Sequence, residues 1–194
     1  TANGVINGVE TIRMEGGSLT VLGGVLDGGY TWNSEDYDNA VLMTSDADRL
    51  VVAKKEGAYG WVSGPIVCNA SKAYISIDCN MMHTNTADFG TVKSFSDVIV
   101  SGDMWMHIEL LGKANVVKLT SALKWPMEIK AMERTYDDTI MEGYDFQLSS
   151  DSNVKNFKYI DFKGNKEYQL RLENNKVVLG IDDLQDFIDN PVRT

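Results

Sequence analysis

The sequence predicts a mainly β protein, an antiparallel β-sandwich or barrel-like domain with one or two short helices. Apolar and polar residues alternate, as in Ile75, Ile77 and Cys79 with Ser76 and Asp78 between them. This period of two is typical of a strand with one buried face. Glycine and asparagine pairs separate the alternating stretches, and helical periodicity is rare. Many short strands between such turns favour a sandwich or a barrel.

The composition indicates one domain over residues 1–194. With 43% hydrophobic and 24% charged residues, the chain has an ordinary globular composition. A chain of this length buries most of its unfolded surface without metals or disulfides. Residues 1–9 carry little charge and contain Gly4 and Gly8, so we expect a flexible or bridging N-terminal arm there.

The alternation predicts a series of strands along the first two thirds of the chain. Pro126 should begin the last of them, because proline lacks the N–H that a central position would need. A helical turn is also predicted at 120–124 or around 133–141. The strands are expected at residues 10–14, 18–22, 30–32, 40–44, 49–54, 61–67, 73–79, 97–100, 103–111, 115–120 and 126–132.

The last forty residues predict a three-stranded antiparallel meander followed by a helix. Asn174 and Asn175 are residue types that tolerate positive φ, which tight hairpin turns need. Residues 182–190 are expected to form a short helix, with Asp182 as its N-cap and Pro191 as its stop. The three strands are expected at residues 157–162, 167–173 and 176–181.

One stretch near the N-terminus suggests a different architecture. Residues 16–29 contain three Gly-Gly pairs around short apolar runs, a pattern that is typical of a β-solenoid coil. A solenoid repeats its pattern at a fixed period over several coils. Here the pattern fades after Gly29, so the sandwich or barrel is preferred.

The two cysteines, Cys68 and Cys79, are predicted to be unpaired. A tight hairpin turn at 69–72 would place Cys68 opposite residue 73. Cys79 would then lie roughly 20 Å away at the rise of a strand, which is too far for a disulfide. Because Cys79 shares a face with Ile75 and Ile77, a buried thiol is expected.

The net charge of −10 is unevenly distributed. Between Arg13 and Arg49 there is no lysine or arginine, although seven acidic residues occur there. This predicts an acidic surface that either aids solubility or meets a partner. The residues expected to form it are Glu35, Asp36, Asp38, Asp46 and Asp48.

Aromatic residues accompany these acids. Aromatic side chains beside carboxylates and amides suit stacking against sugars, so a glycan is a candidate partner. The alternative is that the two tryptophans fill the core or a sheet edge. The candidate aromatic surface consists of Tyr30, Trp32, Tyr37 and Trp61.

No catalytic residue, cofactor site or metal site is predicted. Neither His83 nor His107 has a cysteine or aspartate at ligand spacing. The acidic stretches 33–39 and 46–48 lack the pattern of an EF-hand loop and are expected to be solvated. No nucleophile elbow, phosphate loop or dinucleotide fingerprint is present.

These observations favour a non-enzymatic structural subunit of a large homo-oligomeric assembly, such as a tail tube, capsid decoration or baseplate component of a phage or virus. Its partners would be copies of itself and other assembly proteins, within a virion assembled in a host cytoplasm. The acidic charge argues against specific nucleic-acid binding. No apolar run approaches the roughly 20 residues of a membrane span. The alternative is a carbohydrate- or partner-binding β-sandwich module on a surface or fibre, secreted or at the cell surface, and the third choice is a small hydrolase.

Overall fold

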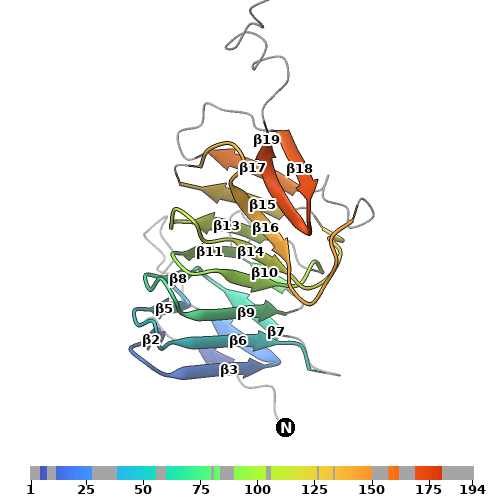
Figure 1. The fold of residues 1–194 in the computed structure, drawn as a ribbon. Coiled ribbons are helices and arrows are strands. Elements are labelled where there is room, and N and C mark those ends of the chain that lie inside the picture. The colour runs from blue at the N-terminus through green and yellow to red at the C-terminus, as the bar shows by residue number, and fades with distance from the viewer. Residues whose placement is uncertain are drawn as a thin grey trace, which may run out of the picture.

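In the computed structural model the chain winds into coils that stack on one another, and each coil contributes a strand to two or three parallel layers (Figure 1). Strands and turns account for the described part of the chain, and no helix occurs in it. No helix long and apolar enough to cross a membrane is found there either. The structure describes residues 5–7, 12–27, 39–55, 60–79, 81–83, 90–103, 106–125, 127–132, 134–149, 157–161 and 169–180.

Three sheets run along the stack. Sheet A contains, in spatial order, β1 (Val5–Asn7), β4 (Gly24–Asp27), β7 (Gly60–Ser63) and β10 (Met81–His83). Sheet B contains β2 (Ile12–Met14), β5 (Val41–Met43), β8 (Ile66–Cys68), β11 (Gly90–Ser94), β13 (Met106–Leu110), β15 (Met127–Ala131) and β17 (Phe157–Asp161). Sheet C contains β3 (Ser18–Leu22), β6 (Arg49–Ala53), β9 (Tyr74–Asp78), β12 (Val98–Val100), β14 (Val117–Leu119), β16 (Thr139–Gly143), β19 (Lys176–Gly180) and β18 (Gln169–Glu173).

Successive coils are in register, so equivalent side chains lie above one another. In sheet B, Val41, Ile66, Val92, Ile108 and Ile129 form one such column. All five are fully buried and belong to the single hydrophobic core. The strands that alternate, such as β6, β9, β13 and β15, therefore point one set of side chains into the centre of the coils. Parallel strands stacked in this way define a β-solenoid. We number its coils 1 to 6 from the N-terminus; β17 and β19 form a seventh level.

The seventh level reverses the strand direction in sheet C. β19 pairs antiparallel with β16, and β18 pairs antiparallel with β19. The hairpin turn consists of Asn174 and Asn175, with φ of 46° and 66°. Asparagine tolerates this left-handed conformation better than most residues. A two-stranded hairpin thus closes sheet C at the C-terminal end of the described stack (Figure 1).

The prediction of a mainly β protein is confirmed, but the antiparallel sandwich or barrel is wrong. All described pairings are parallel except the two that involve β19, and no barrel closes. Alternation of apolar and polar residues indicates that a strand has one buried face, but it does not indicate which strand pairs with it. Most strands predicted in the first two thirds recur close to their expected places. The single strand predicted at 61–67 is wrong, because it is divided between β7 in sheet A and β8 in sheet B, and β4, β10 and β11 were not predicted. The strand predicted at 30–32 lies outside the described residues.

The meander and the helical turns need correction as well. The hairpin of β18 and β19 is present, but β17 pairs parallel with β15 in sheet B. The stretch 120–124 is irregular, and β16 begins within the stretch predicted to be a turn at 133–141. The predicted helix at 182–190 lies outside the described residues. Within the predicted arm, β1 pairs with β4.

Cys68 and Cys79 form no disulfide and are buried, as predicted. The hairpin used to predict this is wrong, because β8 and β9 belong to different sheets of one coil. The thiol of Cys68 lies 3.4 Å from the carbonyl oxygen of Ala70 and 3.7 Å from the hydroxyl of Ser96. Both cysteines contribute to the hydrophobic core.

Candidate functional site

Polar side chains concentrate where each coil turns from sheet B into sheet C, an edge that we call the B–C corner. Asp, Asn, Ser and Gly are frequent here because their backbones and side chains suit tight turns. The turns stack like the strands, so a side chain of one coil reaches the backbone of the next. Among the described residues, the B–C corner consists of residues 15–17, 44–48, 69–73, 95–97, 111–116, 132 and 134–138.

Asp48 joins coils 1 and 2 at this corner. Its buried carboxylate accepts four backbone N–H groups, two from residues 16–17 and two from residues 44–45, at 2.6 to 3.2 Å. Burial alone would raise the pKa of Asp48, but these hydrogen bonds stabilise the charged form and hold the pKa below its ordinary value. One carboxylate therefore fixes two turns at once.

Asn115 and Arg134 continue the same pattern farther along the corner. The amide of Asn115 donates to the carbonyl oxygens of Ser94 and Ser96, at 2.8 and 2.9 Å. The buried guanidinium of Arg134 donates to the carbonyl oxygens of Lys113 and Asn115, each at 2.5 Å, and to that of residue 112 at 3.1 Å. Coils 4, 5 and 6 are thereby joined through side chains that satisfy buried carbonyl groups.

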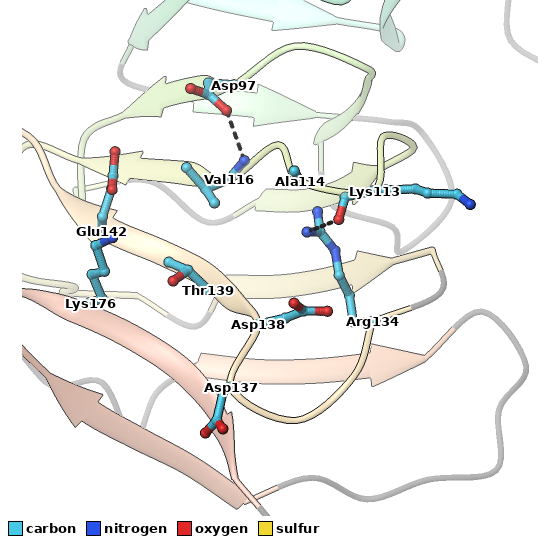
Figure 2. A pocket seen from close by; sticks show the side chains of 10 residues that line it. All are labelled: Asp97, Lys113, Ala114, Val116, Arg134, Asp137, Asp138, Thr139, Glu142 and Lys176. Atoms are coloured by element: carbon cyan, nitrogen blue, oxygen red, sulfur yellow. Dashed lines mark hydrogen bonds between the residues drawn. The ribbon is translucent and has the colours of Figure 1, made fainter.

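A groove lies along the outside of the B–C corner. One hollow of about 450 Å³ is lined by residues of coils 4 to 6 and by Lys176 (Figure 2). A second, of about 570 Å³, extends the hollow to Lys72 in coil 3 and includes Phe95. The two share Asp97, Lys113 and Ala114, so they form one continuous depression. We refer to it as the corner groove.

The carboxylates of the corner groove are engaged within the chain. Asp97 accepts the N–H of Val116 at 2.9 Å and lies 2.8 Å from the ammonium of Lys118 (the first of these contacts is drawn in Figure 2). Glu142 lies 3.6 Å from the same ammonium. The hydrogen bond with Asp97 is the main reason that the pKa of Lys118 is raised. Lys118 therefore stays charged and holds both carboxylates.

The other two groove carboxylates also have partners. Asp137 accepts a hydrogen bond from the guanidinium of Arg171 at 2.5 Å. Asp138 accepts the backbone N–H of Thr135 at 2.7 Å. The acidic groups in this groove are therefore committed to holding the turns and the hairpin in place.

A second charged cluster occupies the outward face of sheet B. Nδ1 of His107 lies 2.9 Å from a carboxylate oxygen of Glu128, and Nε2 lies 3.4 Å from one of Glu109. Lys93 approaches Glu109 at 3.6 Å. The hydrogen bond from His107 is the main cause that lowers the pKa of Glu109. Both ring nitrogens thus face acceptors, which suits a histidine that holds neighbouring strands together.

The structure separates the residues predicted to form an acidic surface. Asp48 is buried at the corner, whereas Asp46 is exposed and accepts the N–H groups of Ser71 and Lys72, both at 2.9 Å. The other three acids, Glu35, Asp36 and Asp38, lie outside the described residues. No group of His, Cys, Asp and Glu within the described ranges is arranged to hold a metal ion.

The predicted aromatic surface is largely outside the described ranges. Trp61 belongs to β7, where its backbone pairs with Val25 and Met81, and Tyr30, Trp32 and Tyr37 are not described. Sequence reasoning missed Phe95, Lys72 and Lys176, which line the corner groove. Phe95 and Lys72 lie in turns and Lys176 begins β19, so no strand periodicity indicates that they share one groove. Comparisons with protein-family models, with curated proteins and with solved structures give no match.

Proposed function

We propose that this chain is a non-enzymatic structural subunit of a homo-oligomeric assembly, of the kind that builds phage or virus particles. The observation that carries the proposal is the interlocked stack of coils. Each sheet repeats in register, and corner side chains such as Asp48, Asn115 and Arg134 bind the backbone of a neighbouring coil. A β-solenoid of this kind is a stiff element whose length is set by its number of coils.

Ion pairs between coils add to this support. Lys54 lies 3.0 Å from Asp78 and 3.1 Å from Asp103, and Lys124 lies 2.7 Å from Asp103. Each exposed pair contributes little alone, but a network along the stack resists shear between coils. A rigid rod with charged sides suits a component of an ordered particle.

Three of the acidic residues singled out in the sequence, Glu35, Asp36 and Asp38, allow a test of this proposal. Replacing Glu35, Asp36 and Asp38 with Gln, Asn and Asn should leave the thermal midpoint nearly unchanged and should alter the size of the assembly. The difference should shrink as salt screens the charges, with a Debye length of about 10 Å at 0.1 M. Sedimentation velocity over a range of protein and salt concentrations measures this.

A control variant changes the net charge equally elsewhere. Glu15→Gln, Asp145→Asn and Glu173→Gln neutralise three exposed acids outside residues 27–48, the range that contains the three replaced acids. This control should assemble as the unaltered chain does. A strictly monomeric particle under every condition would overturn the proposal, and so would the same assembly size in both triple variants.

The second candidate function is a glycan-binding module. The β-sandwich predicted for it is wrong, but one feature of the corner groove favours glycan binding. The corner groove has an exposed aromatic side chain, Phe95, and is also lined by Lys72 and Lys113.

A further inference from the structure

The corner groove combines three features that point to one class of ligand. It is elongated, because its two hollows meet at Asp97 and Lys113 and together span coils 3 to 6 and the hairpin. Such a shape accommodates a chain better than a compact molecule. We propose that the corner groove binds a linear acidic polysaccharide whose carboxylates meet the lysines of the groove.

The corner groove is lined by four carboxylates and four cationic side chains, so the charges that still lack a partner determine which ligand it can bind. The side chains of Asp97, Asp137, Asp138 and Glu142 already have cationic or N–H partners within the chain. By contrast, within the described part of the chain the ammonium groups of Lys72 and Lys176 have no ion pair or hydrogen bond. An incoming carboxylate can therefore pair with these lysines without displacing an internal partner.

The lysines are spread along the axis of the solenoid. Lys72 lies in the turn of coil 3, Lys113 in that of coil 5, and Lys176 in the hairpin at level seven. Neighbouring strands are about 4.8 Å apart, so successive lysines rise by about 10 Å. Arg134 adds a further positive charge beneath the floor of the groove. This distribution suits charges that recur along a polymer better than a single anion.

An apolar ledge formed by Phe95, Leu111 and Met132 begins in the corner groove, where Phe95 is a lining residue. Phe95, Leu111 and Met132 each follow a residue of one register column, and the backbone hydrogen bonds of sheet B continue through Leu111 and Met132. Phe95 is 41% exposed and Met132 38% exposed, so the ledge is open to solvent. Apolar and aromatic surfaces of this kind contact the C–H faces of sugar rings, while polar neighbours bind the hydroxyls.

Two other anionic polymers fit the groove less well. Double-stranded nucleic acid carries one negative charge per about 1.7 Å of its axis, so a protein with a net charge of −10 repels it more strongly than it repels a polymer with one carboxylate per sugar ring. An acidic peptide commonly binds by adding a strand to an open sheet edge. The strands that flank this groove in coils 3 to 6 are paired on both sides. A polysaccharide needs no strand edge and carries its charges farther apart.

Isothermal titration calorimetry at low salt tests the proposal with a defined oligogalacturonate and a neutral oligosaccharide of the same length. The acidic oligomer should bind and the neutral one should bind at least about tenfold more weakly. The double variant Lys72→Gln, Lys176→Gln should weaken acidic binding by about tenfold, and Phe95→Ala should weaken it as well. The thermal midpoint of each variant establishes that it is folded.

The control double variant Arg13→Gln, Lys124→Gln removes the same charge outside the groove and should bind as the unaltered chain does. Failure of the acidic oligomer to bind would overturn the proposal, and so would equal affinity in the two double variants. Equal or tighter binding of single-stranded DNA or polyglutamate would show an unselective anion site and would also overturn it. None of these readouts depends on the size of the assembly, so the two proposals fail separately.

Discussion

At the scale of single residues, the corner carboxylates determine how firmly neighbouring coils are joined. Asp46 and Asp48 are only two positions apart in the sequence, yet Asp46 is exposed and Asp48 is buried. Asp46 uses one oxygen to accept two N–H groups, whereas Asp48 uses both oxygens to accept four. An asparagine retains one acceptor oxygen, so the same substitution has different consequences at the two positions.

We expect Asp48→Asn to lower the free energy of unfolding by about 2–3 kcal/mol at neutral pH, because two buried N–H groups would face an amide that cannot accept them. Asp46→Asn should change it by less than about 0.5 kcal/mol, as at other exposed sites. Urea denaturation measures both. Equal effects would show that Asp48 does not hold the two coils together.

The pH dependence of the same pair follows from linkage. The folded-state pKa of Asp48 lies below its ordinary value of 3.8, so its contribution is fully present above that value. The contribution is lost as the pH falls through the folded-state pKa. The stability difference between the unaltered chain and Asp48→Asn should therefore shrink as the pH drops below about 4.

At the scale of elements, the C-terminal hairpin depends on its two asparagines in different ways. Both have positive φ. Asn175 also accepts the N–H of Leu148 at 2.6 Å and donates to the carbonyl oxygens of Gly143 and Phe146, at 3.3 and 3.2 Å. The side chain of Asn175 thus fastens the hairpin to the loop that follows β16.

Glycine tests this division because it tolerates positive φ at both positions. Asn174→Gly should leave the thermal midpoint nearly unchanged. Asn175→Gly should cost about 1–3 kcal/mol, since the N–H of Leu148 and two carbonyl groups lose their partner. Differential scanning calorimetry distinguishes the two, and a neutral Asn175→Gly would refute the fastening role.

The elements also show what sequence reasoning can establish. Strands such as β3 and β9 were predicted within a residue or two of their observed ends, because alternation marks a buried face directly. Their parallel pairing was not predicted. Cys68, Ser94, Leu110 and Ala131 occupy one position on successive coils but are separated by 26, 16 and 21 residues. A search for a fixed period misses coils whose turns differ so much in length.

The candidate site was harder to predict for a related reason. Asp46 and Asp48 were singled out for their charge, but which of them is buried depends on how the turns stack. Lys72 and Lys176 lie 104 positions apart in the sequence and line one groove only because the coils are superimposed. Composition indicates an acidic protein, and it does not reveal that lysines from distant turns line one groove.

At the scale of the whole molecule, the two thiols report on the integrity of the core. Cys68 and Cys79 are fully buried in the coil interior. We expect a thiol reagent to find no rapidly reacting group in the native protein and two groups in denaturant without reductant. Rapid labelling of one native thiol would show that coil 3 opens locally, and two unreactive thiols in denaturant would contradict their unpaired state.

The register columns also govern how a chain of this kind changes length. Ser94 and Leu110 are equivalent positions on coils 4 and 5, and the residues between them make up one full turn of the solenoid. Duplication or excision of a whole turn preserves every interior column, whereas a one-residue shift inside a strand turns the apolar face outward. Gene-level gains and losses are therefore tolerated in units of one coil, and each unit alters the length of the rod by about 4.8 Å. The length of the solenoid therefore changes only in steps of one strand spacing.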